Sequence, residues 1–380
     1  MCQSAGVDTL GDVAARAGAR AAEIEAMRRL PPDLVAALAA TGVFKLWVPA
    51  VYGGAQAHLR DGLAAIEQVA YHDGSTGWCV MIATTTGLCA GFLPSEHAAA
   101  IYGPAAAITG GFAMPAGTAT RVTAPDGLRV DGRWSWGSGT DHCTAICGGV
   151  RLDDGTGPPR FPIVFFDPAD VELLDTWHVA GLKGTASGDY TVHGAFVPEG
   201  RWVEFAVQPE PVIDHPLYRV SFLGALAVGV AAVVVGLGRR AIDELLALAA
   251  KVPAGSSRSL AERPVVQAQV AQADAAVRSA RAFLGDAADE CWQAAAAGQP
   301  VTPELRRLLR LAATDAVARC AAAVDLCYHA AGGSAIFESH PLQRVFRDTH
   351  VATQHGMVAA RTLETLGRMQ FGLPTGTGQL

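Results

Sequence analysis

The stretch Gly132-Arg-Trp-Ser-Trp-Gly-Ser-Gly-Thr-Asp-His142 lies in the only strand-rich part of an otherwise helical sequence. Trp134 and Trp136 are two residues apart, so on a strand both rings would point to the same face. A small, polar, glycine-flanked bend follows over residues 137–142, where backbone N–H groups can approach a ligand closely. An aromatic wall beside such a bend suits a large planar polar ligand such as a flavin. The alternative from these residues alone is a buried tryptophan pair followed by an ordinary turn.

The composition is typical of a folded protein with a large core. Of the 380 residues, 50% are hydrophobic and 17% are charged, which excludes a disordered chain. The net charge of −7 and the lack of a basic tail argue against a nucleic-acid partner. The eight cysteines form no Cys-x-x-Cys pair, and the first residues carry no basic segment followed by an apolar run. We therefore expect reduced thiols and a cytoplasmic protein.

The period of the apolar residues changes twice along the chain. Residues 8–100 indicate helices, and residues 108–205 alternate as strands do, with a hairpin turn at Pro125-Asp-Gly127. Four long alanine-rich helices then follow, over residues 217–252, 264–297, 303–331 and 341–373. We predict an α+β protein with an N-terminal helical domain (1–105), a central antiparallel β domain (106–210) and a C-terminal four-helix bundle (211–380).

One segment resembles a membrane span. Residues 220–238 carry no charge over a length that could cross a bilayer. Aromatic and basic anchors do not flank the segment on both sides. We therefore expect a helix buried on all sides of the bundle and no membrane contact.

The order of helices, strands and four long helices resembles the acyl-CoA dehydrogenase fold over nearly the whole chain. Within that superfamily it is similar to the two-component flavin-dependent monooxygenases, the branch typified by the oxygenase component of 4-hydroxyphenylacetate 3-monooxygenase. The resemblance depends on four local matches, which occur in the same order as in the family. The first is residues 29–54, which include Phe44-Lys-Leu-Trp-Val-Pro49, and the second is Asp73-Gly-Ser-Thr-Gly-Trp78. The third combines residues 115–119 and 132–139, and the fourth begins at Pro341-Leu-Gln-Arg-Val-Phe-Arg-Asp348 and continues to His355.

The dehydrogenases of this fold remove a substrate proton with a glutamate, and this chain has none at the corresponding positions. The family places that glutamate at one of two positions, which hold Gly356 and Tyr218 here. His355, next to Gly356, is the residue that the resemblance implies as catalytic, since hydroxylases of this branch use a histidine to deprotonate or orient a phenol. Imidazole suits this task because its unperturbed pKa is about 6.5. The alternative is a helix histidine bonded to a neighbour.

The resemblance also implies roles for other residues. His142 would be a second catalytic candidate, in contact with flavin or substrate, or a turn residue that bonds backbone. Seven residues would contact the flavin ring or, from the bundle, the phosphate of a neighbouring subunit's flavin: Trp136, Ser138, Thr140, Thr185, Ser187, Arg258 and Gln267. Four apolar residues would line the substrate pocket, although each is by default a core residue: Trp78, Phe112, Met114 and Phe222.

The expected cofactor is reduced FMN, with FAD as the alternative, and no metal site is expected. The sequence has no Gly-x-Gly-x-x-Gly motif after a strand, so reduced flavin should come from a separate reductase. The resemblance implies an oxygenase component that forms C4a-hydroperoxyflavin and hydroxylates a phenolic or polycyclic aromatic substrate, as a homotetramer or homodimer. Three alternatives remain open, which are N- or S-oxygenation, an acyl-CoA dehydrogenase with a relocated base, and a non-catalytic member of the fold.

Overall fold

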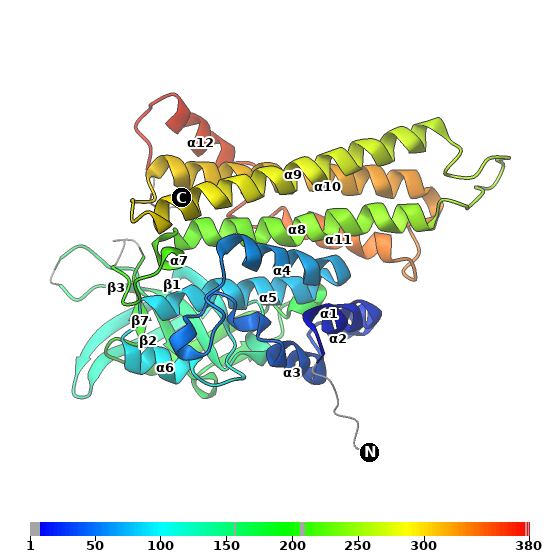
Figure 1. The fold of residues 1–380 in the computed structure, drawn as a ribbon. Coiled ribbons are helices and arrows are strands. Elements are labelled where there is room, and N and C mark those ends of the chain that lie inside the picture. The colour runs from blue at the N-terminus through cyan, green and yellow to red at the C-terminus, as the bar shows by residue number, and fades with distance from the viewer. Residues whose placement is uncertain (1–7, 156, 206–209, 377, 379) are drawn as a thin grey trace, which may run out of the picture. The chain divides into compact units, whose positions relative to one another are not determined.

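The computed structural model describes residues 8–155, 157–205, 210–376, 378 and 380. The described chain runs from short helices through a seven-stranded sheet to long helices, as Figure 1 shows by its colours. It forms two compact units. The strand unit comprises residues up to 57 together with 79–178 and 183–218, and the bundle unit comprises residues 58–78, 179–182 and 219–380. Helix α5 (Gly74–Thr86) contributes its first residues to the bundle unit and the rest to the strand unit.

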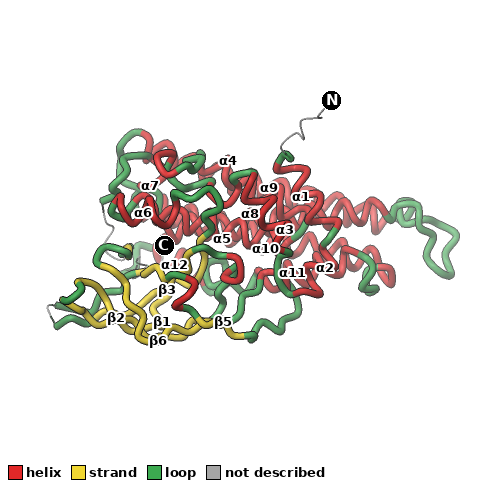
Figure 2. Tube along the Cα trace, turned by 90° about the horizontal axis from the view of Figure 1, so that it is seen from below, coloured by secondary structure: helices red, strands yellow, loops and turns green. Residues whose placement is uncertain are grey.

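The strand unit holds one sheet with the order β5-β6-β2-β1-β3-β4-β7, drawn in yellow in Figure 2. The strands are β1 (Thr109–Thr123), β2 (Asp126–Trp134), β3 (Ala145–Leu152), β4 (Ile163–Phe166), β5 (Glu172–Leu174), β6 (Asp189–Pro198) and β7 (Trp202–Val203). The same unit contains the helices α1 (Leu10–Ala19), α2 (Ala21–Met27), α3 (Pro32–Ala40) and α6 (Ser95–Tyr102). The predicted hairpin is present, since β1 and β2 pair antiparallel from Gly117–Gly132 to Thr123–Asp126. The sheet is mixed rather than purely antiparallel, because β1 and β3 run parallel.

Trp134 is the centre of the strand unit's core. It is fully buried, its ring stacks on Tyr190 at 5.2 Å between centroids, and its Nε1–H donates to the Gly149 carbonyl at 2.7 Å. The prediction that Trp134 and Trp136 form one wall is wrong. Strand β2 ends at Trp134, and Trp136 has a left-handed backbone with φ 62°, so the alternation of a strand no longer applies to its ring.

The bundle unit is built on helix α8 (Phe222–Ala247). Around α8 lie α4 (Leu59–His72), α9 (Pro264–Ala296), α10 (Pro303–Ala331) and α11 (Pro341–Ala352), and Figures 1 and 2 both show α8, α9 and α10 side by side. Gly236 lets α4 approach α8, since a Cβ there would lie 2.5 Å from the Glu67 carbonyl oxygen. By length and composition α8 could cross a membrane, but 83% of its most apolar 18-residue window is buried in the structure. This burial fits the predicted core helix.

The fourth predicted bundle helix, residues 341–373, is wrong as a single element. The helix ends at Ala352, and a shorter helix, α12 (Thr362–Gln370), begins ten residues later in the chain. Local bonds replace the helical pattern between them: the Thr353 hydroxyl donates to the His350 carbonyl at 2.7 Å, and the Met357 N–H donates to the His355 ring at 3.3 Å. His355 therefore lies on a turn and not within a helix. We call residues 353–361 the α11–α12 turn.

Within the predicted helical region of residues 8–100, the first two helices, α1 and α2, meet at Arg20. The short helix α7 (Pro216–Arg219) precedes α8, where one helix from residue 217 was expected. Both interruptions leave the predicted order of the elements unchanged.

Candidate functional site

In the strand unit, three buried hydroxyl groups form a chain between two loops. Ser138 Oγ lies 2.7 Å from Ser187 Oγ, which lies 2.6 Å from Thr185 Oγ1. Backbone bonds join the same loops, since the Gly139 N–H donates to the Thr185 carbonyl at 2.9 Å and the Gly137 N–H to the Gly188 carbonyl at 3.0 Å. The structure thus brings together three of the predicted cofactor contacts, which we call the hydroxyl chain.

Trp136 adjoins the hydroxyl chain in sequence and is an unusual tryptophan. The residue is 61% exposed, its ring centroid lies 5.6 Å from that of Phe112, and its backbone is left-handed. Ala186, which lies between Thr185 and Ser187, also has a left-handed backbone, with φ 47°. Non-glycine residues in this conformation are costly and gather at ligand sites. An exposed aromatic face and buried hydroxyls, held on a strained backbone, fit a flavin ring.

Thr140 and His142 close this loop. The Thr140 hydroxyl donates to the Gly137 carbonyl at 2.8 Å, so it stabilises the turn itself. His142 is half-buried, with its ring 6.0 Å from that of Phe44, and burial lowers its pKa to about 4. His142 is therefore a neutral imidazole at ordinary pH.

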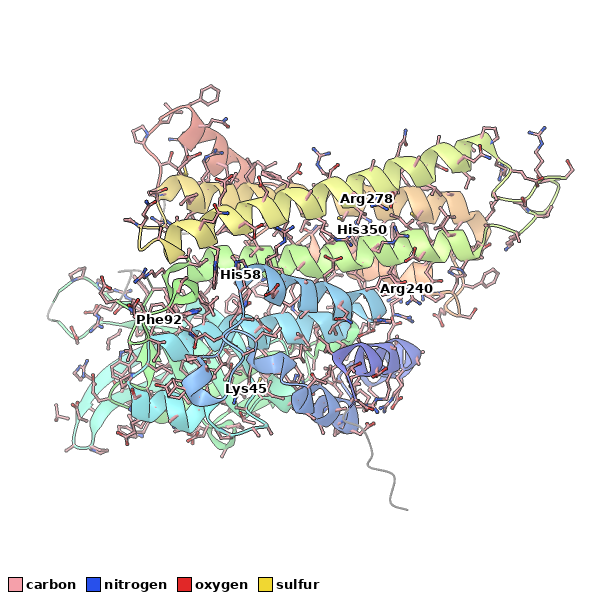
Figure 3. All side chains as sticks on the ribbon, in the orientation of Figure 1. Lys45, His58, Phe92, Arg240, Arg278 and His350 are labelled. Atoms are coloured by element: carbon pink, nitrogen blue, oxygen red, sulfur yellow. The ribbon has the colours of Figure 1, made fainter. Side chains whose placement is uncertain are left out.

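In the bundle unit, His355 meets Trp78, another predicted site residue. The two rings are 5.5 Å apart and nearly perpendicular, and Trp78 is buried. Burial, with a smaller effect of the Arg310 charge, lowers the pKa of His355 to about 4. His350, the histidine nearest to His355 in the sequence, lies on α11 (Figure 3). Its ring contacts a carboxylate oxygen of Asp325 at 2.8 Å. The α11–α12 turn therefore presents one neutral imidazole, that of His355.

Two buried charged residues near this turn were missed in the sequence. Arg310 on α10 is 2% exposed, and its guanidinium donates to the Met357 carbonyl at 2.7 Å. Asp348 on α11 is 3% exposed, and its carboxylate accepts the Leu182 N–H at 2.6 Å. Burial raises the pKa of Asp348 to about 7. The sequence signal for the burial of both residues is a charged residue at an apolar position of a helix. Their bonding partners could not be predicted, because these partners are distant in sequence.

The other predicted residues differ in their surroundings. Phe112 is half-buried and Met114 is 44% exposed in the strand unit, whereas Phe222 is buried at the start of α8. Arg258 and Gln267 are exposed, and the Gln267 amide donates to the Ala261 carbonyl at 2.8 Å. Their predicted flavin contacts stay predictions.

Neither family position for a catalytic base offers a carboxylate. Tyr218 is buried, and its hydroxyl donates to the Trp47 carbonyl at 3.3 Å. Gly356 lies on the α11–α12 turn. Within the described ranges, no three His, Cys, Asp or Glu side chains gather where a metal ion could bind.

Comparisons with known proteins agree with this geometry. The family models for the acyl-CoA dehydrogenase N-terminal domain and C-terminal domain match residues 3–94 and 228–360. An indole-3-acetate monooxygenase of Pseudomonas putida is 32% identical, with 93% of this chain and 90% of the relative covered. The flavin-dependent monooxygenase oxygenase subunit HsaA of Rhodococcus jostii is 30% identical, with 93% and 95% covered.

Among solved structures, the 3-HSA hydroxylase from Rhodococcus sp. RHA1 superposes with a TM-score of 0.91 at 26% identity, and 98% of each chain is covered. XiaF from Streptomyces sp., solved with FADH2 and glycerol, superposes with a TM-score of 0.88 at 26% identity and covers 96% of this chain and 95% of its own. The predicted fold, enzyme class and reduced-flavin cofactor are thereby confirmed. The chain belongs to the two-component flavin-dependent monooxygenases of the acyl-CoA dehydrogenase fold.

Proposed function

We propose that this protein is the oxygenase component that hydroxylates a phenolic or fused-ring aromatic compound. Relatives with 30% and 32% identity are named for monooxygenation, one of them of indole-3-acetate, and a more distant one is named a resorcinol hydroxylase. The observation that carries the proposal is the chemistry of the α11–α12 turn. A neutral imidazole lies next to the position where a dehydrogenase of this fold would hold its glutamate.

The strand unit supplies the proposed flavin contacts. Ser138, Thr185 and Ser187 carry three hydroxyl groups that can donate to the polar atoms of the ring. The exposed face of Trp136 offers an apolar surface on which a planar ring can pack. When bound, reduced flavin supplies the activation of O₂, and the chain's own residues hold the ring, orient the substrate and exclude water.

The bundle unit supplies the proposed substrate contact. His355 can hydrogen-bond to a substrate oxygen, and the buried Trp78 ring beside it keeps water from that imidazole. This assignment predicts that His355→Ala lowers hydroxylation and leaves flavin affinity unchanged.

A separate reductase is the proposed source of electrons. The relatives named as an oxygenase subunit or oxygenase component support such a partner. We further propose a cytoplasmic homotetramer or homodimer, in which the exposed Arg258 and Gln267 reach the flavin of a neighbouring subunit. The hydroxyl chain is proposed to contact the ring that FMN and FAD share, so we propose reduced FMN, with reduced FAD as the alternative.

The test is hydroxylation in a reconstituted system. The protein is supplied with NADH, FMN or FAD, a flavin reductase and a panel of phenols, resorcinol and indole acids, and products with one added oxygen atom are measured by mass spectrometry. We expect a product that requires both proteins. Complete conversion of O₂ to hydrogen peroxide with every aromatic compound, together with reduction of bound FAD by an acyl-CoA, would favour the dehydrogenase alternative.

A further inference from the structure

A buried arginine in the middle of a helix requires an explanation, because an ionised side chain loses its hydration inside a protein. Arg310 lies on the buried face of α10 and is 2% exposed. Its guanidinium donates to the Met357 carbonyl at 2.7 Å and also contacts the Met357 sulfur. The arginine therefore ties α10 to the α11–α12 turn at one residue.

Met357 is also the residue that bonds the ring of His355. The Met357 N–H donates to His355 Nδ1 at 3.3 Å, a long bond whose geometry depends on where the turn places Met357. The carbonyl of Met357 is held by Arg310 and its N–H faces the imidazole. Arg310 thus acts on His355 through a single intervening residue.

This bond determines which ring nitrogen carries the proton. An Nδ1 that accepts an N–H bond cannot itself be protonated, so the neutral ring has its hydrogen on Nε2. In the part of the chain that the structure describes, Nε2 has no hydrogen-bond partner, and His355 is only half-buried. The Nε2–H is therefore a donor available to a ligand.

The charges around the ring oppose a second proton. The Arg310 cation approaches from α10, the apolar Trp78 ring from α5, and Arg361 lies in the turn itself, with its guanidinium 3.5 Å from where a Cβ of Gly356 would lie. Burial lowers the pKa of His355, and the positive charge of Arg310 lowers it further.

We infer that Arg310 is a positioning residue that fixes His355 as a neutral Nε2–H donor, so that His355 gives a hydrogen bond to an anionic oxygen, such as a phenolate, rather than removing a proton. The assignment of the ring's proton stands on contacts within the bundle unit alone. The substrate part of the inference rests on the proposed function, and it selects aromatic substrates that bind as phenolates.

The proton assignment is tested by nitrogen NMR of protein labelled with ¹⁵N-histidine, with the His355 signals identified by their loss in His355→Gln. We expect a neutral ring with Nε2 protonated throughout pH 5–8. In Arg310→Met, we expect a mixture of the two neutral forms and the onset of protonation within this range. Arg307→Met is the matched control, because Arg307 lies one turn earlier on α10 and pairs with Glu304. A wild-type ring protonated at Nδ1, or charged at pH 6, would overturn the inference.

Arg310→Lys covers the case in which Arg310→Met fails to fold, since lysine keeps the charge but not the planar fork of donors. A lysine variant with the wild-type pattern of ring protonation means that charge alone is sufficient, and this would overturn the positioning role of the guanidinium. We expect an altered Nδ1 environment and a His355 that stays neutral.

The donor role is tested by turnover with a phenol. His355→Gln keeps an N–H donor but has no base, so it should retain roughly tenfold more hydroxylation than His355→Ala, the effect of one hydrogen bond to a charged group. Arg310→Met should lower kcat and leave the affinity for reduced flavin unchanged. Equal loss in the Gln and Ala variants would refute the donor role. If NMR gives the expected ring and no wild-type turnover is found with any aromatic compound, the proposed function fails and the proton assignment stands.

Discussion

Replacing Asp348 by Asn should change how the stability of the protein depends on pH. The Asp348 carboxylate is buried in the bundle unit and accepts the N–H of Leu182, whose backbone is left-handed with φ 51°. Burial raises the pKa of Asp348, and the bond from the Leu182 N–H opposes this rise. A second buried carboxylate, that of Asp73, raises the pKa further, while Arg344 and Arg347 lower it in part. An asparagine oxygen can still accept the Leu182 N–H, so the substitution removes the ionisation and keeps the bond.

The magnitude follows from the pKa of Asp348, which rises from 3.8 to about 7 on folding. At about 1.4 kcal/mol for each pKa unit, ionisation of this residue opposes folding by at most about 4 kcal/mol above pH 7. The folded state binds more protons than the unfolded state between pH 4 and pH 7. The free energy of unfolding of the wild type therefore falls as pH rises through this window, and Asp348→Asn should remove that fall.

The assay is urea unfolding of wild type and variant at fixed protein concentration, at half-unit steps from pH 4.5 to pH 8. The difference in the free energy of unfolding between the two proteins should change with a slope of up to about 1.4 kcal/mol per pH unit and level off above pH 7. Asp286→Asn, at an exposed position of α9, is the matched control. Parallel pH profiles for wild type and Asp348→Asn would refute the reasoning.

Three further predictions concern packing and the hydroxyl chain. Gly181→Ala should destabilise the bundle unit by about 3 kcal/mol in urea unfolding, because its Cβ would lie 2.4 Å from the backbone of α11, whereas Gly333→Ala has no atom within 4 Å and should be nearly neutral. Ser187→Ala should weaken binding of reduced FMN about five- to tenfold in an anaerobic titration, since it interrupts the hydroxyl chain, and unchanged affinity would exclude this role. Trp134→Phe should lower the stability of the strand unit by about 2 kcal/mol, through a lost hydrogen bond and a cavity, and an unchanged melting temperature would contradict its place in the core.

The elements predicted best from the sequence are those with local start and stop signals. Residues 303–331 were predicted as one helix, and α10 has these bounds. In α10, the Thr302 hydroxyl accepts the Leu305 N–H at 3.3 Å, Pro303 occupies the first turn, and the chain leaves the helix at Gly332 with φ 57°. Such signals act within one turn of helix, so they can be read without tertiary information.

What the sequence did not predict depends on contacts distant in sequence or on competing local bonds. Arg310 hydrogen-bonds to Met357, and Asp348 to Leu182, which lie 47 and 166 residues away in the sequence. The break after Ala352 arises where side chains replace the helical bonds, although the apolar pattern continues. The hydroxyl chain was predicted as separate flavin contacts, and its mutual bonds follow from the pairing of two loops. Family resemblance supplied His355, and the structure supplied its ring neighbour and its protonation state.

The most direct test of the central claim is the fate of molecular oxygen. The protein, a flavin reductase, NADH and flavin are mixed with an aromatic substrate under ¹⁸O₂, and the ¹⁸O content of the product is measured by mass spectrometry. We predict one labelled oxygen atom in the hydroxylated product, formed only with the reductase present and strongly reduced in His355→Ala. Label recovered only in water and hydrogen peroxide, with bound FAD reduced by an acyl-CoA thioester, would contradict the assignment.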